Sequence, residues 1–197
     1  MNSRAGVAPG RVAALAGAIR ALAPLDAPAD VRLRQFFRAH PQMGKQDRAQ
    51  VADAAFAFLR RKRSIEALAG TTDPRRLALA TLVREERHSV RDLAHALDTA
   101  EREWLADFKA RLPGTLPEAV AADLPDWLWE RLGECMGADA RAAFARGAAQ
   151  SAPMDLRINP LKATRDEARA QLAGDGIDAT PTPWSPWGLR VRGRPML

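Results

Sequence analysis

Basic side chains crowd one short stretch of the sequence and could hold a phosphate backbone. Four of them are consecutive, Arg60, Arg61, Lys62 and Arg63, and Arg48 lies near the start of the same helical pattern. A guanidinium offers phosphate a planar fork and can stack on unpaired bases, which suits RNA. Four consecutive helical residues span a full turn, so they cannot all face one ligand. Taken alone, the run slightly favours the alternative, charge that complements a helix dipole near its C-terminus.

Nucleophilic, metal-dependent and cofactor chemistry find little support in the residues. Cys135 is the only cysteine and sits beside Glu134 near the end of an apolar-striped helix, so we interpret it as a small packing residue. The three histidines, His40, His88 and His95, share no metal-ligand spacing, and we predict no metal site. No glycine-rich phosphate or dinucleotide loop is present. We therefore predict no catalytic residue and no cofactor-binding residue in this chain.

Two tryptophans occur in the segment LPDWLWERLGECMG. Trp127 shares a helical stripe with Leu128, Leu132 and Met136, whereas Trp129 lies off that stripe. An aromatic platform for bases is one interpretation. The spacing favours packing against a neighbouring helix or a following domain.

The positive charge is unevenly distributed. Residues 1–70 carry 12 Lys/Arg against 5 Asp/Glu, residues 71–150 carry 11 against 14, and residues 151–197 carry 7 against 5. A segregated basic region is typical of nucleic-acid binders. A solvated surface in an arginine-rich chain, with 26 Arg and 4 Lys, explains the charge equally well.

The first three quarters of the chain predict an all-helical domain over residues 1–149. Apolar residues recur at helical spacing, and Ala, Leu and Arg favour helix. The expected helices cover Val12–Leu22, 30–40, 46–68 as one long helix, 73–83, 89–97 as a short one, and 98–108. Asp73 caps the fourth of these, Ser89 caps the fifth, and Asp98 with Glu101 opens the sixth. After a break at Leu112–Gly114, two antiparallel helices are joined around Gly137. We expect seven or eight helices around one core.

Residues 150–197 predict a small α+β segment. MDLRINP is a short alternating strand, Thr164 and Glu167 form a capping-box pattern before a helix, and two extended segments flank a Trp-Ser-Pro-Trp-Gly turn. So small a unit normally pairs with more chain. We expect that the segment begins a second domain cut short at Pro195–Leu197.

Membrane insertion is not expected. The apolar N-terminal stretch is interrupted by Arg20 and lacks a cleavage pattern, so we interpret it as a first helix, and no apolar run approaches the ~20 residues of a membrane span. We predict a cytoplasmic protein.

Two stretches resemble the Sun family of RNA 5-methylcytosine methyltransferases, which includes bacterial 16S ribosomal RNA enzymes. The first is G-x-x-D-R-A…L-R, here Gly44, Asp47, Arg48, Ala49, Leu59 and Arg60. The second, more specific one is carried by Leu124, Pro125, Trp127, Leu128, Gly137, Ala152, Pro153, Leu156, Arg157, Ile158, Asn159, Leu161, Lys162, Thr164, Glu167, Leu172, Gly176 and Ile177. The resemblance is weak before residue 44 and good from 124 onward.

The resemblance implies a NusB-like helical domain followed by the segment that leads into a Rossmann-like methyltransferase domain absent from this chain. In the full-length enzyme that domain would bind S-adenosylmethionine and carry two catalytic cysteines. Neither cysteine motif occurs here, so neither role passes to Cys135, and the fragment alone should be inactive. The implied partners are ribosomal RNA and, within the same protein, the missing domain.

The resemblance also makes Arg157, Asn159 and Lys162 candidate RNA contacts. The alternative for all three is hydrogen bonding that holds the strand-to-helix turn together. We favour RNA contact for Lys162 and leave Arg157 and Asn159 open.

Two other functions compete with the methyltransferase fragment. A free-standing NusB-like interaction module explains residues 1–149 but not the strand-rich tail. A helix-turn-helix DNA reader is weaker, because no helix shows the Arg/Asn/Gln pattern that reads base edges. A cofactor loop and cysteine motifs encoded after Leu197 would favour the enzyme.

Overall fold

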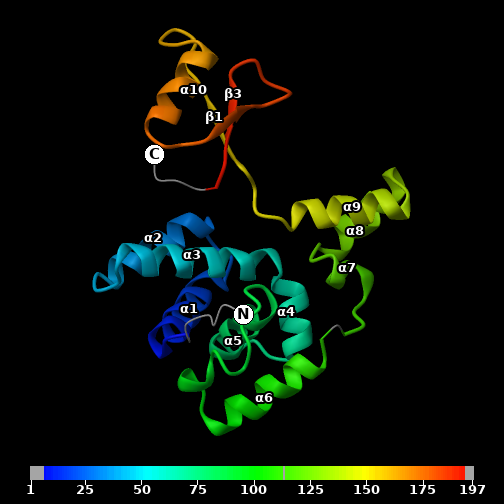
Figure 1. Ribbon diagram of the computed structural model, residues 1–197. Helices are drawn as coiled ribbons and strands as arrows, with labels where there is room; N and C mark the ends of the chain where they lie inside the picture. Colours follow the sequence, from blue (N-terminus) through cyan, green and yellow to red (C-terminus); the bar gives the residue numbers. More distant parts are fainter. Residues whose placement is uncertain (1–6, 113, 194–197) are drawn as a thin grey trace. The chain divides into compact units, whose positions relative to one another are not determined.

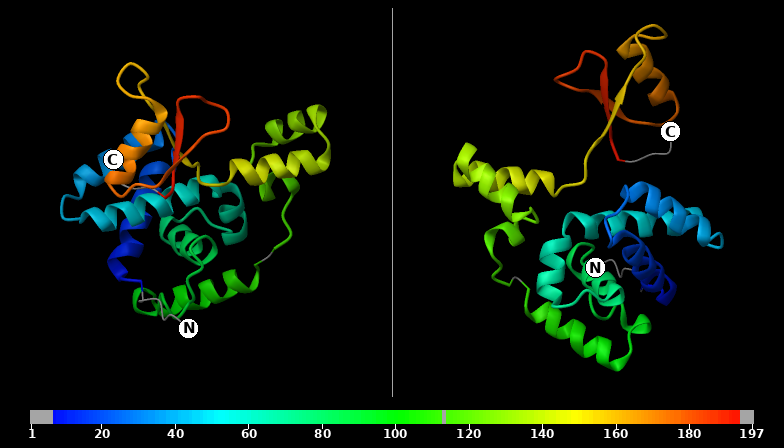
Figure 2. Two further views of the ribbon diagram at one scale, coloured as in Figure 1. Left: turned by 45° about the horizontal axis from the view of Figure 1, so that its top comes forward. Right: turned by 180° about the vertical axis from the view of Figure 1, so that it is seen from behind.

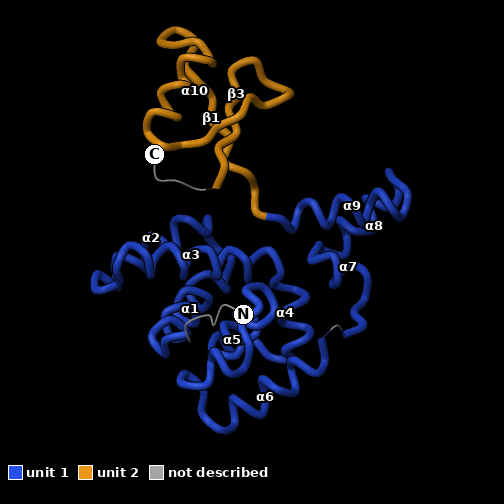
Figure 3. Tube along the Cα trace, in the orientation of Figure 1, with its two compact units in different colours: residues 1–150 blue, residues 151–197 orange. Residues whose placement is uncertain are grey.

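The computed structural model describes residues 7–112 and 114–193, which divide into two compact units, Met1–Gln150 and Ser151–Leu197 (Figure 3). Unit 1 is helical, and unit 2 combines one helix with a small sheet. The predicted fold class, mainly α with a small α+β segment, is confirmed. The expectations placed on the N-terminal six residues, on Pro113 and on Pro195–Leu197 lie outside the described residues.

The first helix of unit 1 packs against three other helices of the same unit (Figures 1 and 2). Val12, Leu15 and Ile19 are fully buried in α1, which packs against α2, α3 and α5. The helices of the unit are α1 Pro9–Leu22, α2 Ala29–Ala39, α3 Lys45–Arg60, α4 Lys62–Ala69, α5 Pro74–Arg84, the 3-10 helix η1 Ala94–Ala96, α6 Thr99–Ala110, α7 Glu118–Ala121, α8 Asp126–Cys135 and α9 Ala138–Ala148.

The single helix predicted over 46–68 is wrong, because the chain breaks at Arg61 into α3 and α4. Arg61 leaves the helical region, with φ −123° and ψ 19°. The apolar periodicity of the sequence continues from α3 into α4. The periodicity therefore does not reveal the break at Arg61. The first turn of α4 is instead capped by Asp123, which accepts a hydrogen bond from the Ser64 N–H although it lies 59 positions after Ser64.

The helix predicted over 89–97 is also wrong. Ser89 and Asp92 bond each other's backbone N–H groups through their side chains, as in a capping box. Turns and the short helix η1 follow in place of an α-helix. The segment is short, and isolated helix nuclei of this length are unfavourable.

Other predicted caps are confirmed. Asp73 accepts a hydrogen bond from the Arg76 N–H ahead of α5, and Asp98 and Glu101 form a full capping box for α6. These motifs act within four residues, so the sequence alone specifies them.

The expectation of one core for all helices holds only in part. The main cluster of buried apolar residues extends from Val7 to Phe108, and Ala145 is the sole buried residue among the described residues of α8 and α9. The two helices nevertheless form the expected hairpin around Gly137. The Arg141 guanidinium, 3.9 Å from the centre of the Trp129 ring, holds them together.

Unit 2 is a three-stranded antiparallel sheet with α10 against one face. Its elements are β1 Met154–Arg157, α10 Arg165–Gly174, β2 Ala179–Pro181 and β3 Gly188–Val191, and the strand order is β1-β3-β2. Leu189 and Val191 on β3 pack with Leu156 of β1 and Leu172 of α10. Side chains alternate along a strand, so Asp155, Arg157 and Arg190 project from the opposite face, which helix α10 does not cover.

None of the described helices combines the length and the apolar character that a membrane span requires.

Candidate nucleic-acid interface

The predicted basic run lies at the α3–α4 junction, where three of its four side chains are paired with acidic groups. Lys62 donates to Glu66 at 2.8 Å, and Arg61 lies 3.6 Å from the carboxylate of Asp123. Arg63 donates to Asp126 at 2.9 Å and to the Leu124 carbonyl. These contacts join the start of α4 to Asp123 and Leu124 ahead of α8 and to Asp126, the first residue of α8. Among the described residues, Arg60 alone of the four has no ion pair.

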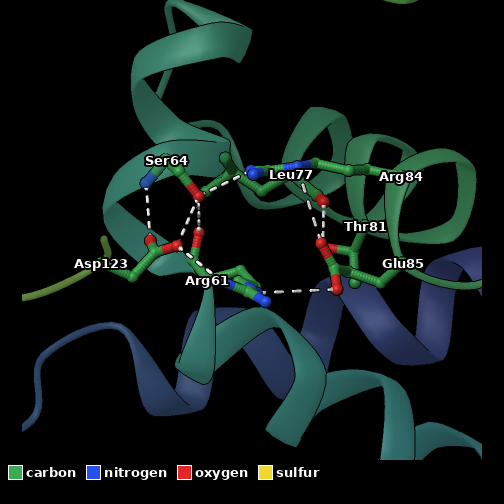
Figure 4. Close-up of polar contacts among 7 residues, drawn as sticks. All are labelled: Arg61, Ser64, Leu77, Thr81, Arg84, Glu85 and Asp123. Atoms are coloured by element: carbon green, nitrogen blue, oxygen red, sulfur yellow. Dashed lines mark hydrogen bonds and ion pairs between the residues drawn. The ribbon is translucent and has the colours of Figure 1, made fainter. Parts of the chain in front are cut away.

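Asp123 is the centre of this junction (Figure 4). Its carboxylate accepts from the Ser64 N–H at 2.8 Å and from the Ser64 hydroxyl at 2.7 Å, and its side chain is only 4% exposed. Asp123 has φ 56°, a left-handed conformation that aspartate tolerates better than most residues. The carboxylate thus caps α4 from a distant part of the chain.

The same network reaches α5. Arg84 donates to the Ser64 hydroxyl at 2.6 Å, and Arg61 and Arg84 both lie within 4.0 Å of Glu85. Within α5, the Thr81 hydroxyl donates to the Leu77 carbonyl at 2.7 Å. Figure 4 shows these groups converging between α4 and α5. The arginines of this junction thus stabilise the packing of unit 1.

Arg48 also has an intramolecular role. Its guanidinium donates to the Met43 carbonyl at 2.9 Å and to the carbonyls of His40 and Pro41 at 3.4 and 3.3 Å. It therefore fixes the turn between α2 and α3. The RNA contacts predicted for Arg48 and for Arg60–Arg63 stay predictions.

The candidates in unit 2 are differently placed. Lys162 is exposed and has no ion pair among the residues described. The Arg157 guanidinium lies over the Trp187 ring, 5.1 Å from its centre, and likewise has no carboxylate partner in the described chain. Asn159 holds the turn after β1, since its side chain accepts from the Leu161 N–H at 3.1 Å. The Asn159 side chain thus takes part in the turn, and the RNA contacts predicted for Arg157, Asn159 and Lys162 stay predictions.

The turn after β1 and the β2–β3 loop meet at one end of the sheet. The Ile158 N–H donates to the Trp187 carbonyl at 2.9 Å, and Arg165 donates to the Ser185 carbonyl at 3.3 Å. Figure 1 shows both loops at the same end of unit 2. Arg157 and Arg165 therefore lie at this end, and Lys162 lies in the turn that joins β1 to α10. We call this region, with Trp184 and Trp187, the loop end of unit 2.

The other arginines of unit 2 that the structure describes each lie near a carboxylate. Arg190 makes a two-pronged contact with Asp155 at 2.7 and 2.8 Å, and Arg192 lies 3.2 Å from Asp178. The Arg190 hydrogen bond lowers the pKa of Asp155, which keeps this pair charged. Positive charge without a nearby counter-charge is thus concentrated at the loop end.

Sequence reasoning missed Arg165 and Trp184. Arg165 is the first residue of α10, whose predicted capping box is confirmed: the Thr164 N–H and hydroxyl hydrogen bonds lower the pKa of Glu167. Trp184 lies in the turn that the sequence predicted. No local pattern showed that these residues approach the end of β1, because the approach depends on how β1 pairs with β3.

The remaining candidates for chemistry are scattered. Cys135 is exposed on α8, so its interpretation as a packing residue is wrong, because α8 lies outside the main core. Trp127 is likewise 68% exposed. His40 bonds the Phe36 carbonyl and His88 bonds Glu86. No group of three or more His, Cys, Asp or Glu suited to a metal ion occurs in the part of the chain that the structure describes.

A comparison with known protein families finds a match for the C-terminal part of the chain. Residues 124–195 match the family described as Methyltr_RsmF/B-like, ferredoxin-like domain. This part of the chain is therefore similar to that family. The resemblance to the Sun family is thereby confirmed.

One curated relative is similar to a part of the chain, and one solved structure is similar to nearly all of it. The "Probable ribosomal RNA small subunit methyltransferase B" of Synechocystis sp. is 36% identical over 70 residues, which are 36% of this chain and 16% of that protein. The crystal structure of PH0851 has a TM-score of 0.59 and 17% identity, and covers 98% of this chain and 51% of that one. At that identity the structure shows a shared fold alone. The chain therefore spans about half of the length of PH0851 and about a sixth of the length of the Synechocystis protein.

The matched region begins at residue 124, ahead of unit 2. It includes α8 and α9, which lie outside the core of unit 1, and all of the loop end. Arg157, Lys162, Arg165 and Trp184 thus belong to the matched domain. Arg48 and Arg60–Arg63 precede it.

Proposed function

We propose that this chain binds and positions ribosomal RNA for an S-adenosylmethionine-dependent (cytosine-C5)-methyltransferase. The observation that carries the proposal is the loop end of an RsmF/B-like domain, where three cations have no carboxylate partner among the described residues. Phosphate contacts of this kind fix the register of a nucleic acid, while specificity comes from its shape and from other contacts.

The two units have different tasks in this proposal. Unit 2 supplies Arg157, Lys162 and Arg165 for phosphate. Unit 1 supplies a rigid helical body whose basic junction is braced by Asp123, Glu85 and their partners. Arg60 is the residue of the basic run that is best placed to add a phosphate contact.

Methyl transfer is assigned to another part of the same protein. The described strands of this chain form an antiparallel sheet, and none of them leads through a glycine-rich turn into a helix, so these residues do not fit S-adenosylmethionine. We propose that a methyltransferase domain contacts this chain within a cytoplasmic protein. The fragment by itself should transfer no methyl group.

The test is salt-dependent binding to fragments of small-subunit ribosomal RNA. Each phosphate contact to a single strand contributes about 0.7 to the slope of log K against log salt concentration. The triple variant R157A/K162A/R165A should lower the slope by about 2. The matched control R169A/R192A removes exposed arginines that have carboxylate partners and should change the slope much less. Salt-insensitive binding, or an unchanged slope in the triple variant, would contradict the proposal.

A further inference from the structure

The β2–β3 loop presents one side chain almost completely to solvent. Trp184 is 95% exposed, more than any other large apolar side chain in the described chain. Single exposed apolar residues are common and by themselves indicate nothing. The loop that carries Trp184 and the groove beside it are what set this residue apart.

The loop is held in one conformation. Pro183 and Pro186 flank Trp184 and Ser185, and proline fixes φ near −65°. The Thr182 N–H donates to the Gly188 carbonyl at 3.0 Å, and the Gly188 N–H donates to the Ser185 carbonyl at 3.2 Å. A ligand that binds Trp184 therefore has little backbone entropy to remove.

Glycine is required at the base of this loop. A Cβ at position 188 would lie 2.0 Å from the Thr182 Oγ1 atom. The close approach lets the Thr182 hydroxyl reach the Ser185 carbonyl at 3.4 Å. The indole of Trp184 is thus carried on a closed, internally bonded turn.

Trp184 shares a shallow groove of about 300 Å³ with Arg157. The groove is also lined by the Asp155–Arg190 pair, whose charges cancel. The Trp187 ring holds the Arg157 guanidinium at 5.1 Å without removing its charge. The groove therefore offers a flat aromatic surface beside one uncompensated cation.

We infer that Trp184 stacks on an unpaired base of the RNA while Arg157 holds an adjacent phosphate. This inference rests on the proposed function and names the nucleotide site within it. An exposed indole and a guanidinium complement the π-face and the phosphate of one nucleotide. Bases within a duplex are stacked on each other, so the site takes single-stranded or looped RNA. An apolar protein partner would instead leave the Arg157 charge buried and unpaired.

The experiment compares W184A with the wild-type full chain on two probes. One probe is a short single-stranded RNA, and the other is the same sequence in a duplex. Stacking of one base is worth about 1–3 kcal/mol, so W184A should weaken single-strand binding roughly 5- to 150-fold. Duplex binding and the salt slope should stay unchanged, because no charge is removed.

Two matched variants complete the design. W184F keeps an aromatic face and should recover most of the lost affinity. W127A removes another exposed indole, on α8, and should bind both probes as the wild type does. Because Trp184 is solvent-exposed, W184A should keep the wild-type circular dichroism spectrum and melting temperature.

The outcomes separate the inference from the proposed function. Equal single-strand affinities of wild type and W184A would overturn the stacking site and leave RNA positioning intact. A loss of equal size on both probes, or no recovery in W184F, would also overturn it. If the wild type binds neither probe nor ribosomal RNA fragments, the proposed function fails as well.

Discussion

Removal of the Asp123 carboxylate should destabilise unit 1 although no apolar contact is lost. In Asp123→Ala the Ser64 N–H, buried at the start of α4, loses its acceptor. The Ser64 hydroxyl still reaches the Arg61 carbonyl at 3.2 Å, and Arg61 keeps Glu85. The cost is therefore mainly one unsatisfied buried donor and one lost helix cap.

The expected magnitude follows from these two losses. An unsatisfied buried donor costs about 1–3 kcal/mol, and loss of an N-cap costs about 0.5–2 kcal/mol. The two overlap, because the Ser64 N–H is the capped group. Because they describe the same group, we expect Asp123→Ala to lower the free energy of unfolding by about 1–3 kcal/mol.

Two further substitutions separate the effect of the lost carboxylate on stability from the effect of the left-handed backbone. Asp123→Asn keeps one acceptor oxygen and should lose less. Asp123→Gly removes the carboxylate but suits φ 56°, so it should be about 1 kcal/mol more stable than Asp123→Ala. Asp126→Ala is the control: its ion pair with Arg63 is exposed, and such pairs contribute less than about 1 kcal/mol.

Urea denaturation followed by far-ultraviolet circular dichroism measures these differences. The slopes against urea should stay alike, so that a change in midpoint reports stability. If Asp123→Ala and Asp126→Ala cost the same, within about 0.5 kcal/mol, Asp123 does not cap α4. If Asp123→Gly is no more stable than Asp123→Ala, the left-handed backbone carries no strain.

Two predictions concern other parts of the chain. The Arg75 hydrogen bond lowers the pKa of Glu101 below its ordinary 4.5. The stability that ionised Glu101 contributes is therefore present above pH 4.5 and is lost as the pH falls through the lowered pKa. The difference in unfolding free energy between wild type and Glu101→Gln should therefore shrink below pH 4.5; a difference independent of pH would refute this. Gly188→Ala should destabilise unit 2 by about 1–3 kcal/mol, because its Cβ would collide with Thr182. Gly174→Ala, whose Cβ would meet nothing within 4 Å, should be neutral or slightly stabilising in thermal unfolding, and equal effects of the two would contradict the steric argument.

The order of elements was predictable because its causes are local. Helical periodicity, the Asp73 and Asp98 caps, the Thr164–Glu167 box and the strand before Pro160 all depend on residues within about four positions of each other. The same string of residues from Leu124 to Ile177 carried the family resemblance. These features needed no knowledge of which segments meet.

Only the tertiary structure decided which charges are free. The sequence shows Arg61 and Arg63 as part of a basic run, but Asp123 and Asp126, about sixty positions away, pair with them. Conversely, the pairing of β1 with β3 brings Arg157 to the loop that carries Trp184. The energy of a charge depends on its distance from its counter-charge, and that distance is set by chain packing rather than by separation along the sequence.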